Sequence, residues 1–246
     1  NIAGQLALNG KKVLTIDGDI QQNLTQLFFE NIPDELLTVQ NDIFEDGELR
    51  KGVDTLYHVL EGETNVYDAI RSVEFTSRRK LKNKFKKKEC KVDVLVGSKD
   101  MKYFGCEDFN ILKEKLTVLQ DEYDYIIIDT PPNYNAITMM YLLASDYVLI
   151  PMHLAKSSSL HAYSDVINAV KEAREDYGNK NLTILGSFYM AVQLYKNDQK
   201  EFHEYSMNKE ISESMSLFKT SIRYDYSSTR DSENAGKPLC ICCAST

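Results

Sequence analysis

Three aspartates follow short apolar runs at two places in the sequence. Asp129 ends the run Tyr-Ile-Ile-Ile, while Asp17 and Asp19 follow Val-Leu-Thr-Ile, with Gly18 between them. Carboxylates in such positions can hold a magnesium ion beside nucleotide phosphates, directly or through a water. A buried strand followed by an ordinary turn, or a solvated acidic turn, would explain the same residues without chemistry. Because the pattern of apolar run, Asp and loop occurs twice, we favour one site shared by two strand ends.

The elements that must position these acids are β-strands of a parallel sheet. The β-branched run before Asp129 is too short for a helix and predicts a strand buried on both faces. Pro131 and Pro132 stop that strand and stiffen the following loop. Asp17 and Asp19 leave a second strand two positions apart, and the carboxyl ends of strands are where open α/β sheets bind ligands. Further helices are expected at 55–60, 109–119 and 157–177, a loop followed by a helix at 133–143, and further strands at 147–151 and 182–192.

Length and composition predict one domain with a full hydrophobic core. The chain has 246 residues, of which 43% are hydrophobic, and a formal net charge of −8. Five cysteines are an odd number and form no disulfide framework, which favours a reducing, cytoplasmic setting. The longest nearly apolar stretch, Met139 to Met152, is too short to span a bilayer, so no stable membrane insertion is expected.

Five segments follow one another along nearly the whole chain: Asp17–Thr25, Val92–Ser98, Tyr123–Pro132, Asp146–Pro151 and Gly236–Pro238. In this order they resemble segments of ParA-type partition ATPases, a branch of the P-loop NTPases, in which Asp17–Thr25 is similar to "DxDPQGNxT" and Tyr123–Pro132 is similar to the Walker B segment. The likeness implies a three-layer α/β fold around a mainly parallel sheet.

The chain departs from that family at the loop that cradles the phosphates. No Gly-rich Lys-Ser/Thr segment occurs, and residues 1–12 resemble the helix that follows this loop in the family. We therefore expect residues 1–246 to be a single ATPase domain that lacks both ends. Without the backbone N–H groups and the lysine of that loop, the fragment is expected to bind ATP poorly. A non-catalytic binding module that naturally lacks the loop is the alternative from a different class.

The resemblance implies a magnesium-dependent ATP hydrolase with named residues. Asp19 would orient or activate the attacking water, Asp17 would support the magnesium shell, and Asp129 would hold magnesium through a water. Pro131 and Gln193 are assigned, with Asp17, to the nucleotide, since the loop 193–200 lies where the family places the adenine. Candidate DNA contacts are Arg223, Arg230 and Lys237.

The implied role is segregation of a plasmid or chromosome. The protein would be a homodimer switched by ATP that binds DNA non-specifically in the nucleoid, with a ParB-like adaptor stimulating hydrolysis. A membrane-positioned, MinD-like ATPase is an alternative, because Ile20 replaces the proline of the partition motif. That alternative requires an amphipathic C-terminal helix.

A strongly basic run covers residues 78–91. Nine of its fourteen residues are Lys or Arg and one is Glu, whereas the rest of the chain holds 20 basic and 36 acidic residues, a net charge of −16. The run predicts either a contact with nucleic acid phosphates or another anionic surface, or a solvated, mobile loop before the strand at 92.

Overall fold

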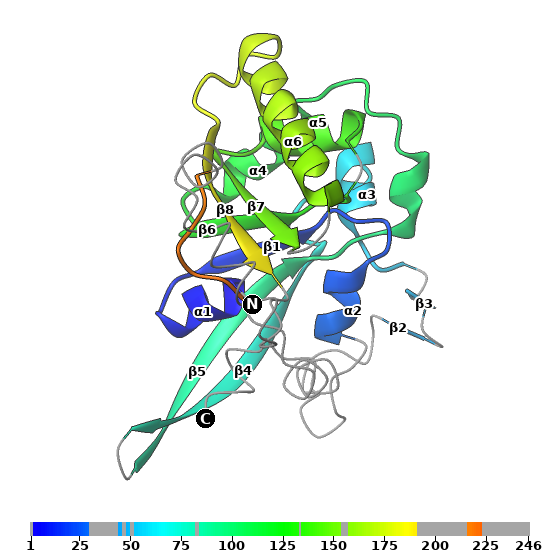
Figure 1. Cartoon of the computed structure of the whole chain (residues 1–246). Coiled ribbons are helices and arrows are strands. Elements are labelled where there is room, and N and C mark those ends of the chain that lie inside the picture. The colour runs from blue at the N-terminus through cyan, green and yellow to red at the C-terminus, as the bar shows by residue number, and fades with distance from the viewer. Residues whose placement is uncertain are drawn as a thin grey trace. The chain divides into compact units, whose positions relative to one another are not determined.

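Helices and strands alternate along the chain in the computed structural model (Figure 1). The structure describes residues 2–29, 44–45, 48–49, 52–81, 84–132, 134–153, 157–190 and 216–222. The predicted α/β class is confirmed. The described residues divide into two compact units, one within residues 2–107 and 114–132, the other within residues 108–113 and 134–222. That residues 1–246 form a single domain lacking both ends stays a prediction.

The first unit contains a four-stranded sheet in the order β4-β5-β1-β6. Strands β5 and β6 both run parallel to β1, while β4 pairs antiparallel with β5. The sheet is therefore mainly parallel, as predicted. Its elements are α1 (Ile2–Leu8), β1 (Val13–Asp17), α2 (Asn23–Phe29), the short antiparallel pair β2 (Phe44–Glu45) and β3 (Glu48–Leu49), α3 (Leu56–Glu61), β4 (Ile70–Leu81), β5 (Lys84–Leu95), the 3-10 helices η2 (Lys99–Tyr103) and η3 (Thr117–Leu119), and β6 (Tyr125–Asp129); α4 (Ile111–Leu116) begins in the second unit and ends in the first.

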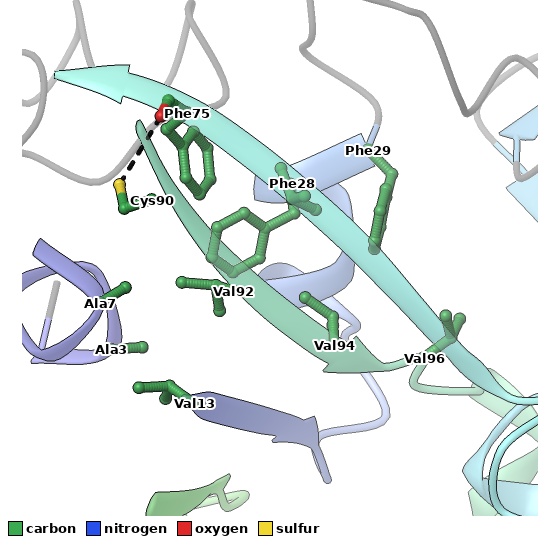
Figure 2. Packing of buried hydrophobic residues seen from close by; sticks show 11 residues of the cluster. Ala3, Ala7, Val13, Phe28, Phe29, Phe75, Cys90, Val92, Val94 and Val96 are labelled. Carbon is green, nitrogen blue, oxygen red and sulfur yellow. Dashed lines mark hydrogen bonds between the residues drawn. The ribbon is translucent and has the colours of Figure 1, made fainter. Parts of the chain in front are cut away.

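Strand β1 is the buried centre of this sheet. All five of its residues are buried, and because successive side chains point to opposite faces, both faces of the sheet are covered there. Helices α1 and α2 pack on β1, β4 and β5 through one hydrophobic cluster (Figure 2), in which Phe28 of α2 meets Phe75 of β4 with ring centroids 5.8 Å apart. Burial on both faces, which was predicted only for the strand before Asp129, is thus found in β1.

The same expectation is wrong for β6. Its three isoleucines are only half-buried, and Tyr125 is 45% exposed. The reason lies in the strand order, because β6 is the last strand on its side of the four-stranded sheet in the described part of this unit.

In the described part of the basic run at 78–91, residues up to Leu81 belong to β4 and residues from Lys84 belong to β5. These residues therefore lie in an antiparallel hairpin and not in a loop. The register is continuous from Ile70↔Leu95 to Leu81↔Lys84. Near the sheet, the apolar residues at 73, 75, 90 and 92 alternate with polar ones and place this end of the hairpin in the core. The sequence at 78–91 has no such alternation, so it does not indicate that the pairing continues.

The second unit is built on the parallel pair β7 (Tyr147–His153) and β8 (Thr183–Met190). Helices α5 (Ala136–Leu143) and α6 (Ser157–Glu175) share a hydrophobic cluster with the residues around these strands. Asn135 caps α5, since its side-chain oxygen accepts a hydrogen bond from the Thr138 N–H at 3.1 Å. Among the described residues, no helix has both the length and the apolar composition needed to cross a membrane.

Candidate functional site

The carboxyl ends of β1 and β6 lie next to each other at one edge of the sheet. The two strands pair in parallel with Asp17 directly opposite Asp129. The chain then leaves β1 through Gly18, whose N–H donates to the carbonyl oxygen of Asp129 at 2.9 Å. Asp19 follows immediately, so the three predicted acids occupy neighbouring strand ends in one unit.

Asp17 is fully buried and holds the start of helix α2. Its Oδ2 accepts two hydrogen bonds from Thr25, one from the backbone N–H at 2.7 Å and one from the hydroxyl at 2.6 Å. Its Oδ1 accepts a longer one, 3.4 Å, from the N–H of Asp19. The carboxylate thereby ties the end of β1 to the helix that follows it.

Gly97, which follows β5, closes the network around Asp17. Its N–H donates to the Thr25 hydroxyl oxygen at 3.0 Å, and its carbonyl accepts from the side chain of Gln22 at 2.9 Å. A Cβ at position 97 would lie 2.8 Å from Cγ of Asp17, so only glycine fits. Gln22 itself is buried and has a φ of 55°, where the family pattern has glycine.

Asp19 lies at the open side of this loop and is half-buried. Its Oδ1 accepts the N–H of Gln21 at 3.0 Å, and its carbonyl accepts the N–H of Gln22 at 3.0 Å. The first bond is the pattern of an Asx turn, which orients the carboxylate from its own backbone. The loop between β1 and α2 is thus fixed at both ends while Asp19 keeps access to solvent.

The three carboxyl groups affect one another electrostatically. Burial raises the pKa of Asp17 to about 6, although the hydrogen bonds from Thr25 counteract it, and the charge of Asp129 adds to the rise. The pKa of Asp129 is raised too, first by loss of solvent around the carboxyl and second by the charge of Asp19. A cation placed among these groups would relieve that repulsion.

The donor set fits magnesium in part. No ready-made cluster of three His, Cys, Asp or Glu side chains exists among the described residues. Magnesium does not need one, because it is usually held by one or two carboxylates together with waters and substrate phosphates. Asp129 and Asp19 can supply such oxygens. Oδ2 of Asp17 already accepts two hydrogen bonds from Thr25, so this oxygen has less capacity to bind a cation than the carboxylates of Asp19 and Asp129.

Unfolding free energy should depend on pH through Asp17. Its folded pKa of about 6 lies above the ordinary 3.8, so the folded state keeps a proton that the unfolded state has lost. The contribution of Asp17 to the free energy of unfolding is therefore complete below about pH 4. It decreases by up to about 3 kcal/mol as the pH rises to about 6. Urea unfolding of the wild type and of Asp17→Asn between pH 4 and 7 measures this. The stability difference between them should change over that window, and a constant difference would contradict the assignment.

The remaining predicted residues divide into described and undescribed ones. Pro131 follows β6 and is half-buried, which is consistent with a stiff loop leaving the site. Gln193, Arg223, Arg230 and Lys237 lie outside the described residues, as do the segments around 193–200 and 236–238.

Sequence reasoning missed three residues that hold the site in place. Thr25 and Gln22 stand inside the motif that begins at Asp17, and Gly97 follows the strand that ends at Leu95. Their signal was weak, since a threonine eight residues after an aspartate and a glycine after a strand both occur for many reasons. Only the fold shows that Asp17, Thr25 and Gly97 meet.

Comparison with known proteins gives a family match and several relatives. A family model described as "AAA domain" matches residues 1–184. The sporulation initiation inhibitor protein Soj of Bacillus subtilis is 25% identical over 240 residues, 92% of this chain and 84% of Soj. The chromosome-partitioning ATPase Soj of Treponema pallidum is 25% identical over 189 residues, 77% of this chain and 63% of that protein. The chain spans only 55% to 63% of the length of the first curated relatives that it matches.

Solved structures share the fold. A variant of McdA from Cyanothece in complex with ATP superposes with a TM-score of 0.67 at 20% identity, covering 97% of this chain and 81% of McdA. Cobyrinic acid a,c-diamide synthase of Mycobacterium smegmatis, with a bound ATP analogue and magnesium, gives a TM-score of 0.65 at 18% identity, over 95% of this chain and 81% of that one. At these identities the likeness speaks for the fold alone. The family match covers residues 1–184 of 246, and together with the Soj relatives it shows that the chain belongs to the AAA-domain family of the ParA/Soj type.

Proposed function

We propose that the full-length protein to which this chain belongs carries out magnesium-dependent ATP hydrolysis as a ParA-like partition ATPase. The observation that supports this most is the pairing of Asp17 with Asp129 at the ends of two parallel strands, with Asp19 beside them. The pKa values of Asp17 and Asp129 are raised mainly by burial and further by a neighbouring carboxylate, Asp129 in the first case and Asp19 in the second. A magnesium nucleotide bound at this edge, where α/β sheets bind ligands, would relieve that repulsion.

Each acid has a separate role in the proposal. Asp19 orients the attacking water and accepts its proton, because its carboxylate is held by the Gln21 N–H and stays accessible. Asp129 holds the magnesium shell through a water, from the end of a strand that the sheet fixes. Asp17 keeps negative charge behind the site and positions the loop through Thr25. Magnesium, when bound, neutralises charge that develops on the phosphate oxygens.

Relatives support the nucleotide and the metal. The McdA variant of Cyanothece was solved with ATP, and the cobyrinic acid a,c-diamide synthase with an ATP analogue and magnesium. Pro131 and Gln193 remain proposed nucleotide contacts. Hydrolysis also needs a lysine that neutralises the leaving phosphate. Residues 1–246 contain no Gly-rich loop with a lysine that could take this role.

The names of relatives support a biological role for the protein. A relative is named as a chromosome-partitioning ATPase, and another as a protein that maintains carboxysome distribution. We propose that the chain likewise positions a cargo, a plasmid or chromosome, as an ATP-switched homodimer on nucleoid DNA with a ParB-like adaptor. Arg223, Arg230 and Lys237 remain proposed DNA contacts.

Hydrolysis of ATP tests this proposal. The protein, expressed with any residues that its reading frame encodes before Asn1, should release phosphate from ATP slowly with magnesium and not at all with EDTA. Light scattering should show a dimer with ATP and a monomer with ADP. Failure to hydrolyse ATP in magnesium would reject the enzymatic function and favour a binding module.

A further inference from the structure

The β4–β5 hairpin has a buried root and a far part of different composition. In the root, residues 70–75 pair with residues 90–95, and Val73, Phe75, Cys90 and Val92 are buried in the cluster with α1 and α2 (Figure 2). Strand β1 pairs only with residues 93–95 of β5. Beyond these positions, the hairpin continues past the end of β1 (Figure 1).

Asp93 anchors the root. Its Oδ1 accepts the Ser72 hydroxyl at 2.6 Å and lies 3.2 Å from the ammonium group of Lys91, while its Oδ2 accepts the Tyr123 hydroxyl at 3.0 Å. These contacts join β4, β5 and the segment that leads into β6. The root is therefore fixed to the rest of the first unit, and the far part of the hairpin continues from it.

The far part, called the tip below, consists of residues 76–81 paired with residues 84–89. No third described strand pairs with it. Its sequence has seven basic residues and one acidic residue, Glu89. The basic residues are Arg78, Arg79, Lys80, Lys84, Lys86, Lys87 and Lys88.

The register places like charges opposite each other. Arg78 pairs with Lys87, and Arg79 pairs with Lys86. Like charges in direct cross-strand pairs destabilise a sheet, and a two-stranded hairpin without further packing is only marginally stable. One or two lysines would be enough to protect an edge strand from aggregation. Cationic pairs on both strands therefore indicate a partner that supplies negative charge.

We propose that the tip binds the phosphate backbone of double-stranded DNA, an inference that rests on the proposed function and gives its DNA contact a place in the fold. A two-stranded ribbon fits the major groove of B-DNA, and six residues at about 3.3 Å each give the tip a reach of about 20 Å. The chain outside residues 78–91 carries a net charge of −16. This negative charge would repel a broad anionic surface such as a membrane. A narrow ribbon can contact a DNA rod while the acidic body stays away from it.

Neutralising both like-charged pairs isolates this contact. The hairpin variant is Arg78→Gln, Arg79→Gln, Lys86→Gln and Lys87→Gln. The matched control, with the same change in net charge, is Lys102→Gln, Lys113→Gln, Lys171→Gln and Lys180→Gln, all at exposed positions. Affinity for a 40-base-pair duplex is measured by fluorescence anisotropy with magnesium ATP, at several salt concentrations, on the full-length protein.

The hairpin variant should bind DNA at least about tenfold more weakly than the control, and its slope of log affinity against log salt should fall by about 3 to 4. Its melting temperature should not drop, because the substitutions remove unfavourable pairs. Equal binding by the two variants would overturn the inference and leave DNA binding to other residues. Absence of binding by the wild type would reject the DNA part of the proposed function as well. If the hairpin variant lost binding to vesicles of anionic lipid but kept its binding to DNA, the inference would also be overturned, and a membrane surface would be favoured.

Discussion

Asp19→Ala is expected to lower ATP turnover by about 10²- to 10⁴-fold while nucleotide affinity changes by no more than a few-fold. The carboxylate of Asp19 is set by the Gln21 N–H at the open side of the loop, and removing it leaves the Asp17–Thr25 network intact. The loss should therefore appear in kcat. Since the charge of Asp19 helps to raise the pKa of Asp129, the variant should also lower that pKa.

Steady-state phosphate release and titration with a fluorescent ATP analogue separate turnover from affinity. Asp121→Ala is a suitable control, because Asp121 is an exposed aspartate in the turn before β6 of the same unit. It should hydrolyse ATP like the wild type. Turnover by Asp19→Ala within a few-fold of the control would show that another group orients the water.

Thr25→Val should destabilise the protein by about 2–4 kcal/mol. Valine keeps the shape of threonine but removes the hydroxyl, which donates to buried Asp17 at 2.6 Å and accepts the Gly97 N–H at 3.0 Å. One charged acceptor and one backbone donor would then lose a partner in a buried place, and each such loss costs about 1–3 kcal/mol, or more for a charged group. The pKa of Asp17 should rise further, since a hydrogen bond to its charged form is gone.

Thr25→Ser separates the hydroxyl from the packing. Serine keeps the donor and acceptor and loses one methyl group, so the loss of stability should be about 1 kcal/mol. Urea unfolding at pH 7 measures both variants. If Val and Ser destabilised the protein equally, the hydrogen bonds around Asp17 would have no special part in holding the loop.

The elements around the site could largely be predicted from the sequence, because each has a simple local signal. The apolar runs before Asp17 and Asp129 gave both strands, and Leu56, Val59 and Leu60 gave the helical spacing of α3. The alternation of strands and helices gave the fold class. These signals depend only on which residues face a core.

Two features could not be predicted from the residues that form them. The half-burial of β6 follows from its place at the edge of the sheet, which no residue of the strand reveals. The pairing of Arg78 with Lys87 runs against cross-strand charge preference, so the sequence pointed to a loop.

The site shows the same division. Resemblance pointed to Asp17, Asp19 and Asp129, and the register of β1 and β6 brings their strand ends together. The two hydrogen bonds from Thr25 to Asp17 could not be foreseen, because a carboxylate after a strand looks the same in the sequence whether it faces a metal or a buried hydroxyl. Gly97 has a role only because β5 lies beside β1.

A crystal structure of the full-length protein with magnesium and a non-hydrolysable ATP analogue would test directly whether the ends of β1 and β6 form one nucleotide site. We expect magnesium within one bridging water of the Asp129 carboxylate and the terminal phosphate on the side of Asp19. Nucleotide bound elsewhere on the protein, or magnesium coordinated without Asp129 and Asp19 nearby, would contradict the proposed mechanism.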